Sequence, residues 1–248
     1  MPALLELDHI GFSYHTLAGE IPALSQISFS VQEGEFVSLV GPSGCGKSTV
    51  LNLIAGLLVP ERGQITIQNI SGEHASLSIG YMLQKDHLFE WLTIYKNVLL
   101  GLEIQKKKTK KTVAYVHRLL QEYGLWDFRS SHPSQLSGGM RQRAALIRTL
   151  ALEPSLLLLD EPFSALDYQT RLSVSNDIWK ILQKERKTAL LVTHDISEAI
   201  SMSDRVIVLS KAPSCVRCEI AAFTCFKRDR FSRLLSTYRF SCFFYGRI

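Results

Sequence analysis

The chain has 248 residues, of which 46% are hydrophobic and 21% are charged, so it has the composition of a globular protein and is not a small stapled module. Its apolar runs fall short of the roughly 20 residues that a membrane span needs, and no secretory signal opens the sequence, so we expect a cytosolic location. The formal net charge of +5 derives partly from the run at residues 105–111. Nucleic acid or an anionic membrane would suit such a run, but its lack of aromatic residues favours a solvated loop and no nucleic-acid partner.

The first part of the chain is predicted to combine short strands with one helix. Alternating hydrophobic residues indicate strands at residues 5–14, 27–31, 36–40, 64–68 and 78–83. The strand at 36–40 runs directly into a glycine-rich turn, after which a helix is expected over residues 47–57. That helix should bury one stripe of apolar side chains, namely Val50, Leu51, Ile54 and Leu57.

A helical block between residues 86 and 153 then interrupts this pattern. Its predicted helices cover residues 93–104 and 111–124, and a third begins near residue 137. Strands and helices alternate again afterwards, with strands at 155–160, 188–193 and 205–210 and helices at 168–186 and 195–202. Such alternation predicts an α/β fold with a mainly parallel sheet covered on both faces.

The segment GPSGCGKST at Gly41–Thr49 fits the phosphate-loop pattern G-x-x-x-x-G-K-[ST] in the required position between a strand and a helix. Glycines allow backbone N–H groups to turn toward phosphates, and the helix N-terminus adds partial positive charge. Lys47 is predicted to neutralise β- and γ-phosphate oxygens, and the Ser48 hydroxyl is predicted to bind Mg²⁺. The predicted nucleotide-binding residues here are Gly41, Pro42, Ser43, Gly44, Cys45, Gly46, Lys47, Ser48 and Thr49.

Polar residues follow three other predicted strands. The leucine run at 156–159 ends in Asp160, placed to bind Mg²⁺, and Glu161, a candidate general base for hydrolysis. Gln84 follows the strand at 78–83 and His194 follows the strand at 188–193. Because the carboxyl ends of parallel strands meet at one edge, we expect Gln84 to contact water and metal and His194 to contact the γ-phosphate. Alone, His194 would be read as a core or capping histidine.

The segment LSGGMRQR at residues 136–143 has the features of a second anion-binding loop. Ser137 is a good N-cap, Gly138 and Gly139 allow close backbone approach, and the following helix directs its positive end at the anion. It lacks the Gly-Lys-Ser ending of a complete phosphate loop. The arginines that follow, at positions 141, 143 and 148, are expected to face solvent or acids and are not assigned a catalytic role.

These motifs, in this order, resemble the ATP-binding subunits of ABC transporters over Leu4 to about Ser210, and LSGGMRQR is the most specific of them. The resemblance implies a P-loop, RecA-like core with an antiparallel β region near the N-terminus and an inserted helical subdomain. It divides the chain into four parts: the first part of the ATP-binding core at residues 1–85, the helical subdomain with the signature at 86–153, the second part of the core at 154–211 and the tail at 212–248. It further implies ATP and Mg²⁺, with Ser48, Gln84 and Asp160 as metal ligands, and an ATPase reaction.

The family also implies a head-to-tail dimer in which the signature of one subunit closes over the ATP held by the other, with a homodimer expected. Asp167, at the end of the matching motif Ser164–Asp167, is then a nucleotide-site residue. The matching aromatic residue for stacking on adenine is Tyr14, whose alternative is a tyrosine packed in the core.

The segment at 81–104, with Trp91 six residues before Asn97, is similar to importer ATPases of the nitrate, sulfonate and taurine group. It implies a peripheral subunit on the cytoplasmic face of the membrane, partnered by permease subunits and an extracytoplasmic solute-binding protein. Phe89 and Trp91 are either exposed anchors for a permease helix or core residues of the helical block.

An efflux or lipid-export ATPase is the alternative function. A non-transport ABC ATPase is a weaker alternative, because the chain has one set of motifs and no sustained heptads.

The tail from about residue 212 departs from the family pattern. It is rich in Phe, Arg, Cys and Ser with weak periodicity, and we expect a divergent end with poor order. Four of the five cysteines lie there (Cys215, Cys218, Cys225 and Cys242), so they form no framework for the domain. Cys215 and Cys218 form one C-x-x-C without a second pair at zinc-site spacing.

Overall fold

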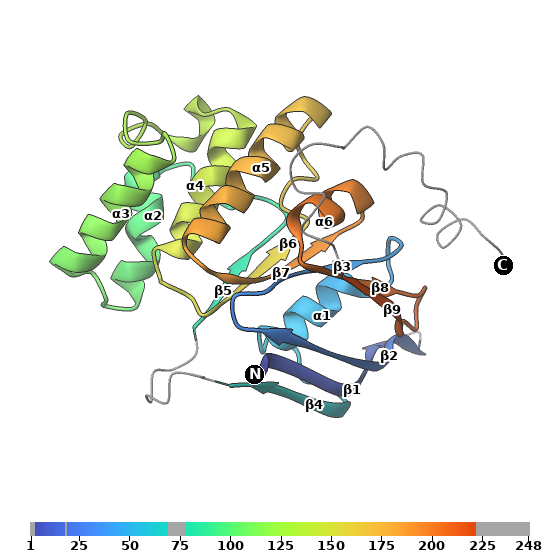
Figure 1. The fold of residues 1–248 in the computed structure, drawn as a ribbon. Helices are drawn as coiled ribbons and strands as arrows, with labels where there is room; N and C mark the ends of the chain where they lie inside the picture. Colours follow the sequence, from blue (N-terminus) through green and yellow to red (C-terminus); the bar gives the residue numbers. More distant parts are fainter. Residues whose placement is uncertain (1–2, 18, 69–77, 222–248) are drawn as a thin grey trace.

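A computed structural model describes residues 3–17, 19–68 and 78–221 (Figure 1). Its strands are β1 (Ala3–Thr16), β2 (Gly19–Gln32), β3 (Phe36–Val40), β4 (Arg62–Ile67), β5 (Ile79–Met82), β6 (Leu156–Asp160), β7 (Thr188–Thr193), β8 (Arg205–Leu209) and β9 (Val216–Ala221). Its helices are α1 (Lys47–Ile54), α2 (Ile94–Ile104), α3 (Lys110–Glu122), α4 (Gly138–Leu150), α5 (Tyr168–Lys184) and α6 (Ile196–Met202), and a 3-10 turn covers Pro133–Gln135.

The larger sheet has the strand order β5-β6-β7-β3-β8-β9, and all neighbours pair in parallel except β8 and β9. The run at 156–159 in β6 is fully buried, with alternate leucines on opposite faces. Leu157 and Leu159 join the core beneath the helical layer, whereas Leu156 and Leu158 join the core around α1. The predicted mainly parallel sheet with two covered faces is therefore confirmed.

A second, antiparallel sheet has the order β2-β1-β4 and packs with α1 against the larger sheet (Figure 1). The predicted stripe on α1 is correct for Val50, Leu51 and Ile54, which are almost completely buried. It is wrong for Leu57, which is 67% exposed. The helix ends at Ile54, and Gly56 then turns the chain with a φ of 71°, so the helical periodicity does not extend to residue 57.

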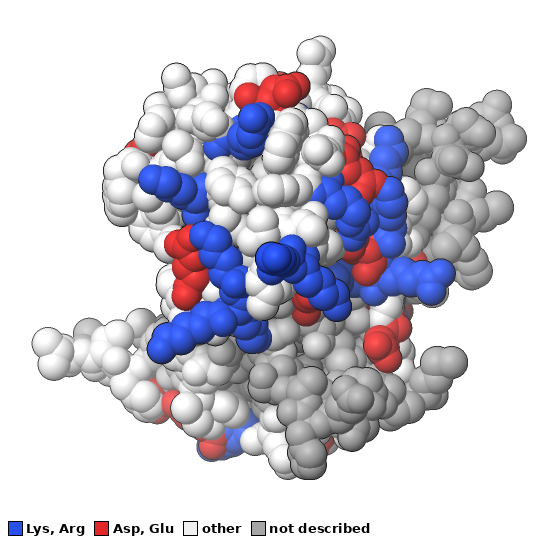
Figure 2. All heavy atoms as spheres, turned by 90° about the vertical axis from the view of Figure 1, so that its left-hand side faces the viewer, with Lys and Arg blue, Asp and Glu red and all other residues white. Residues whose placement is uncertain are grey.

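The inserted block forms the helical layer, in which α2, α3 and α4 pack beside α5 on the face of the sheet opposite α1 (Figure 1). Its helices begin where the sequence offers side-chain caps: Thr93 for α2, Thr109 for α3 and Ser137 for α4. Lys and Arg side chains are numerous on the outer face of this layer, but acidic side chains lie among them (Figure 2). Within the run at 105–111, for example, Lys108 pairs with Glu103 at 2.6 Å.

The larger sheet continues beyond residue 211, where the predicted core ends. Val216–Ala221 form β9 antiparallel to β8, and Arg205 of β8 pairs with Glu219 of β9. The expected poor order therefore does not apply to residues 212–221, because β8 still offers an unpaired edge there. Cys225, Cys242 and the rest of 222–248 lie outside the described residues. Within the described part of the chain, no helix has both the length and the apolar character needed to cross a membrane.

Two residues of α5, one buried and one exposed, provide a test of how this helix packs against the core. Ile178 is 0% exposed in the core under the helical layer, whereas Leu172 is 43% exposed. We expect Ile178→Ala to lower the free energy of unfolding by about 2–5 kcal/mol, because it removes buried methyl groups and leaves a cavity. Leu172→Ala should have a much smaller effect. Urea unfolding of both variants measures this, and equal losses would contradict the packing of α5.

Candidate functional site

The phosphate loop at Gly41–Thr49 connects β3 to α1 with a backbone that favours glycine at defined points. Gly44 and Gly46 have φ values of 75° and 93°, in the left-handed region. A Cβ on Gly46 would lie 2.7 Å from Leu24 Cδ2, and one on Gly41 would lie 2.8 Å from Cys45 Sγ. Cys45 is buried and fills the inside of the loop, and burial raises the pKa of its thiol. This backbone has the form required to surround phosphate oxygens.

Lys47 and Tyr14 lie on two sides of this loop. Lys47 is buried, and its Nζ donates to the carbonyls of Gly41 (2.8 Å) and Pro42 (3.0 Å), so its charge is held within the loop. The Tyr14 hydroxyl is 2.9 Å from Thr49 Oγ1, and its ring is 40% exposed. The core alternative for Tyr14 is therefore wrong, because an open ring stands beside the start of α1.

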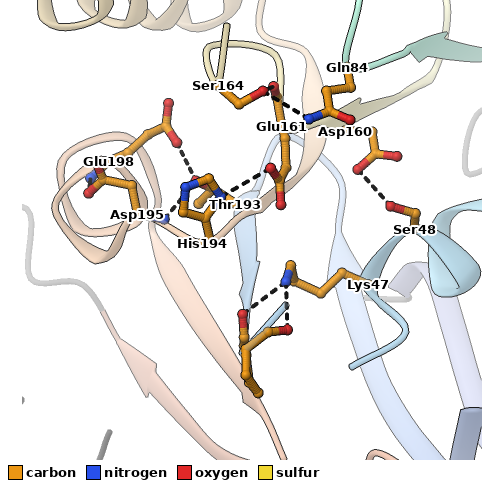
Figure 3. A network of polar contacts seen from close by, with 12 residues as sticks. Lys47, Ser48, Gln84, Asp160, Glu161, Ser164, Thr193, His194, Asp195 and Glu198 are labelled. Carbon is orange, nitrogen blue, oxygen red and sulfur yellow. Dashed lines mark hydrogen bonds and ion pairs between the residues drawn. The ribbon is translucent and has the colours of Figure 1, made fainter. Parts of the chain in front are cut away.

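Ser48 in the first turn of α1 and Asp160 at the end of β6 bring two side-chain oxygen groups together. Ser48 Oγ donates to Asp160 Oδ1 at 3.0 Å (Figure 3). Burial raises the pKa of the Asp160 carboxyl and the charge of Glu161 adds to the rise, whereas the Ser48 hydroxyl and Lys47 oppose it. A hydroxyl and a carboxylate are hard oxygen donors, the type that Mg²⁺ prefers, and a positive ion would favour the ionised form of Asp160. The residues present thus fit the predicted metal.

Glu161 and His194 form a second pair, separated from the first by a turn of the backbone. Glu161 has a φ of 43°, uncommon for a residue other than glycine, and its N–H donates to the Val192 carbonyl at 2.9 Å. This turn directs its carboxylate to His194, whose Nδ1 is 3.0 Å from Glu161 Oε2 (Figure 3). Two acids adjacent in sequence therefore point to different partners.

Gln84 approaches the same region from the end of β5. Its Nε2 donates to Ser164 Oγ at 3.2 Å, and Ser164 Oγ donates to the Glu161 carbonyl at 3.0 Å. Figure 3 shows Lys47, Ser48, Gln84, Asp160, Glu161 and His194 around one region at the carboxyl edge of the sheet. Ser164 was not predicted to be part of the site, although it begins the motif Ser164–Asp167. The sequence feature that could have indicated it is a hydroxyl residue three positions after the candidate general base.

The signature residues lie elsewhere. Ser137 Oγ accepts from the Met140 N–H at 3.3 Å and caps α4, which packs on the opposite face of the sheet from α1. Glycine is favoured at positions 138 and 139 for a reason that the sequence did not indicate. A Cβ on Gly139 would lie 2.6 Å from Val174 Cγ2, and one on Gly138 would lie 2.9 Å from Leu166 Cδ2. Both glycines therefore already permit close packing within the chain.

Asp167 is the N-cap of α5 and accepts from the Thr170 N–H at 3.1 Å. These hydrogen bonds hold the pKa of the Asp167 carboxyl below its usual range. Its side chain is thus engaged in starting α5, and its predicted contact with nucleotide stays a prediction.

A half-buried acid close to His194 was not predicted from the sequence. Glu198 on α6 accepts a short hydrogen bond from the Thr193 hydroxyl, and Thr193 Oγ1 accepts from the Asp195 N–H at 3.0 Å (Figure 3). Arg171 lies 3.6 Å from Asp195 Oδ2 and also donates to the Leu166 carbonyl. Burial raises the pKa of Glu198 to about 7, with Asp195 adding to the rise and the Thr193 hydroxyl, Arg171 and His194 opposing it.

This acid predicts a pH dependence of stability. The Glu198 carboxyl has a pKa of about 7 when folded and near 4.5 when unfolded, so folding takes up a proton between these values. The free energy of unfolding of the parent should therefore fall, relative to Glu198→Gln, by up to ~3 kcal/mol as the pH rises through this window. Urea unfolding of both proteins below, within and above the window measures the difference. Parallel pH profiles would contradict a raised pKa of Glu198 in the folded chain.

The chain is similar to known proteins over most of its length. YtlC of Bacillus subtilis (strain 168), an uncharacterized ABC transporter ATP-binding protein, is 49% identical over 214 residues, covering 86% of this chain and 82% of the relative. ThiZ of Halalkalibacterium halodurans, a formylaminopyrimidine import ATP-binding protein, is 42% identical over 210 residues, covering 85% and 81%.

Among solved structures, the dimeric post-hydrolysis state of the ATP-binding cassette MJ0796 bound to ADP and Pi has a TM-score of 0.71 to this chain. The two are 32% identical, and the match covers 88% of this chain and 98% of that one. The family model described as ABC transporter matches residues 24–164, which is more than half of the chain. With its phosphate loop and converging acids, the chain belongs to the ABC transporter family and is an ATP-binding subunit with the cassette fold of ATP-hydrolysing enzymes.

Proposed function

We propose that this chain is the ATPase subunit of an importer and energises the uptake of a small solute through a partner membrane permease. It would act as a peripheral subunit on the cytoplasmic face of the membrane. The observation that carries the ATPase part is the convergence of Lys47, the Ser48–Asp160 pair and the Glu161–His194 pair at one sheet edge. Names of relatives such as ThiZ support the direction of transport.

Each side chain of the site has a defined task in this proposal. Lys47 neutralises β- and γ-phosphate oxygens, and Ser48, Gln84 and Asp160 hold Mg²⁺, which when bound offsets the negative charge of the phosphates. Glu161 accepts a proton from the attacking water, and the resulting reaction gives ADP and phosphate. His194, 3.0 Å from Glu161, orients that carboxylate and contacts the γ-phosphate. The exposed ring of Tyr14 stacks on adenine.

A second copy of the chain completes each site. The N-terminus of α4 with Ser137 lies on the helical layer, whereas the phosphate loop precedes α1 on the other face of the sheet. A helix N-terminus with free N–H groups suits a phosphate, so the signature is assigned to the ATP held by the partner. The dimeric state of the similar MJ0796 cassette supports this arrangement. ATP binding then closes the dimer, and hydrolysis reopens it.

Phe89 and Trp91 are the proposed contact with the permease. Trp91 is 73% exposed and Phe89 is 36% exposed, and their ring centroids are 4.9 Å apart. The buried side chain of Asn97 fixes their loop, since its Nδ2 donates to the carbonyls of Phe89 and Leu92. An exposed aromatic pair on a fixed loop suits a groove for a helix of the permease.

The solute is proposed only by class. The segment at 81–104 favours the nitrate, sulfonate and taurine group, with an extracytoplasmic solute-binding protein as a further partner, whereas ThiZ is named for formylaminopyrimidine. A permease gene and a solute-binding protein gene beside the gene for this chain would favour import. Neighbouring genes for an exporter would contradict it.

The shared-site dimer is tested with Glu161→Gln. Without the general base the chain should bind ATP but not hydrolyse it, so turnover should fall by at least ~10²-fold and an ATP-dependent dimer should accumulate. Size-exclusion chromatography with and without ATP measures the dimer. Adding Lys47→Ala to this variant supplies the control, because losing the phosphate-loop charge should abolish both ATP binding and the dimer. A Glu161→Gln chain that binds ATP but stays monomeric at high concentration would sink the shared site.

The assignment of the signature to the partner's ATP is tested by replacing Ser137 with either of two helix-capping residues of equal size, Asp and Asn. Asp and Asn both cap helices well, but only Asp adds negative charge where the partner's phosphate would lie. We expect Ser137→Asp to lower turnover by at least ~10²-fold and Ser137→Asn to lower it far less, because the charge of Asp opposes the phosphate. Both should leave ATP binding by the monomer intact. Weakened monomer binding in Ser137→Asp, measured with a fluorescent ATP analogue, would place Ser137 in its own site instead.

A further inference from the structure

Arg148, near the end of α4, has an environment that the sequence did not predict. It was expected to face solvent or acids, but its guanidinium donates to two successive backbone carbonyls. Nη1 donates to the His87 carbonyl at 2.6 Å, and Nη2 donates to the Asp86 carbonyl at 2.7 Å. Burial lowers the pKa of Arg148, and the Asp86 carboxylate opposes this. Because a guanidinium stays charged in proteins, the result is two charge-assisted hydrogen bonds in a partly buried setting.

A second arginine on α4 holds the same residue. Arg141, in the first turn of the helix, lies with Nε 3.2 Å from Asp86 Oδ2. Residues seven apart lie on one face of a helix, so the side chains of Arg141 and Arg148 both reach Asp86 from the same face of α4. Asp86 is thus fixed to α4 by both its carboxylate and its carbonyl.

The segment held in this way follows directly after Gln84. His87 has a φ of 46°, a left-handed conformation that persists in a residue other than glycine only where neighbours stabilise it. On its far side, Phe89 exchanges hydrogen bonds with the buried Asn97 of α2 (2.7 Å and 3.1 Å). The chain from 86 to 89 is therefore fixed between α4 and α2 and has little freedom to move independently of α4.

We infer that Arg148, with Arg141, is a positioning residue that transmits the state of Gln84 in one ATP site to the signature that the same chain offers to the neighbouring site. The inference rests on the proposed shared-site dimer. Its physical basis is that α4 is a single helix with Ser137 at its start and Arg148 near its end. Its interior residues, such as Ala144 and Ile147, are fully buried, so the helix moves as one body.

The chemistry requires arginine at this position. The planar guanidinium reaches two adjacent carbonyls at once, whereas the ammonium of lysine is a point charge on a flexible stem. Arg148→Lys therefore keeps the charge but loosens the connection. Arg143→Lys is the matched control on the same helix, because Arg143 contacts the Tyr123 carbonyl (3.3 Å) and Asp177 (4.0 Å) instead of the segment after Gln84.

Both substitutions are compared in the Glu161→Gln background by sedimentation velocity with ATP and Mg²⁺. Arg148→Lys should weaken the ATP-dependent dimer by at least ~10-fold, the size expected for losing a hydrogen bond to a charged group. Arg143→Lys should leave the dimer unchanged. Both should stay folded and keep the parent's ATP affinity as a monomer, although Arg148→Lys should lower the Tm because it loses a partly buried hydrogen bond. Equal dimers in the two variants, or weaker ATP binding by the Arg148→Lys monomer, would overturn the inference.

A second measurement does not need the dimer. At concentrations where the chain is monomeric, adding ATP should change amide hydrogen exchange across residues 136–141 in the parent and in Arg143→Lys, but not in Arg148→Lys. Asp86→Asn, which removes the charge beside Arg141 but keeps the backbone carbonyl that accepts from Arg148, should give a partial loss. If ATP does not affect exchange across this segment in the parent, the inference is wrong. Failure of Glu161→Gln itself to dimerise, with this exchange response intact, would instead contradict the proposed function.

Discussion

The parallel pairing of β6 between β5 and β7 is the constraint on which the whole site depends. The register pairs Met82 with Leu159 and Asp160 with Val192, so three strands end at nearly the same level. Gln84, the two acids and His194 follow those ends and arrive at one edge from segments far apart in sequence. The pairing is stable because alternate leucines of β6 enter two different cores. A slip of one residue would reverse the two faces and separate the acids from their partners.

The sequence was sufficient to predict the architecture and which polar side chains lie at one edge of the sheet, for reasons specific to the residues. A run of four leucines before two acids has few alternatives to a strand buried on both faces, and a phosphate loop requires a strand before it and a helix after it. The caps Ser137 and Asp167 set the starts of α4 and α5 in the same local way. Features that depend on one element and its immediate neighbours in sequence were therefore accessible.

Contacts between distant segments were not accessible, except where parallel strands bring their carboxyl ends to one edge. The strand β9 forms because the edge of β8 is open to pairing. The role of Gly139 in packing against Val174 and the bonds from Arg148 to the chain after Gln84 involve partners that are distant in sequence. Composition and spacing hold no record of such contacts, so an arginine that binds carbonyls looks the same in sequence as one that faces water.

The bond between Tyr14 and Thr49 has a consequence for which nucleotides the chain can accept. Tyr14 belongs to the antiparallel sheet, whereas Thr49 lies in the first turn of α1, which follows β3 of the larger sheet, and their hydroxyls are 2.9 Å apart. The packing of the two sheets therefore fixes the span from the proposed base platform to the site of the terminal phosphate. Stacking accepts any base, since every base has a π-face. Selection between nucleotides would then depend on the length of the phosphate chain. A nucleoside triphosphate would extend from Tyr14 to Gln84 and His194, whereas a diphosphate would end short of them.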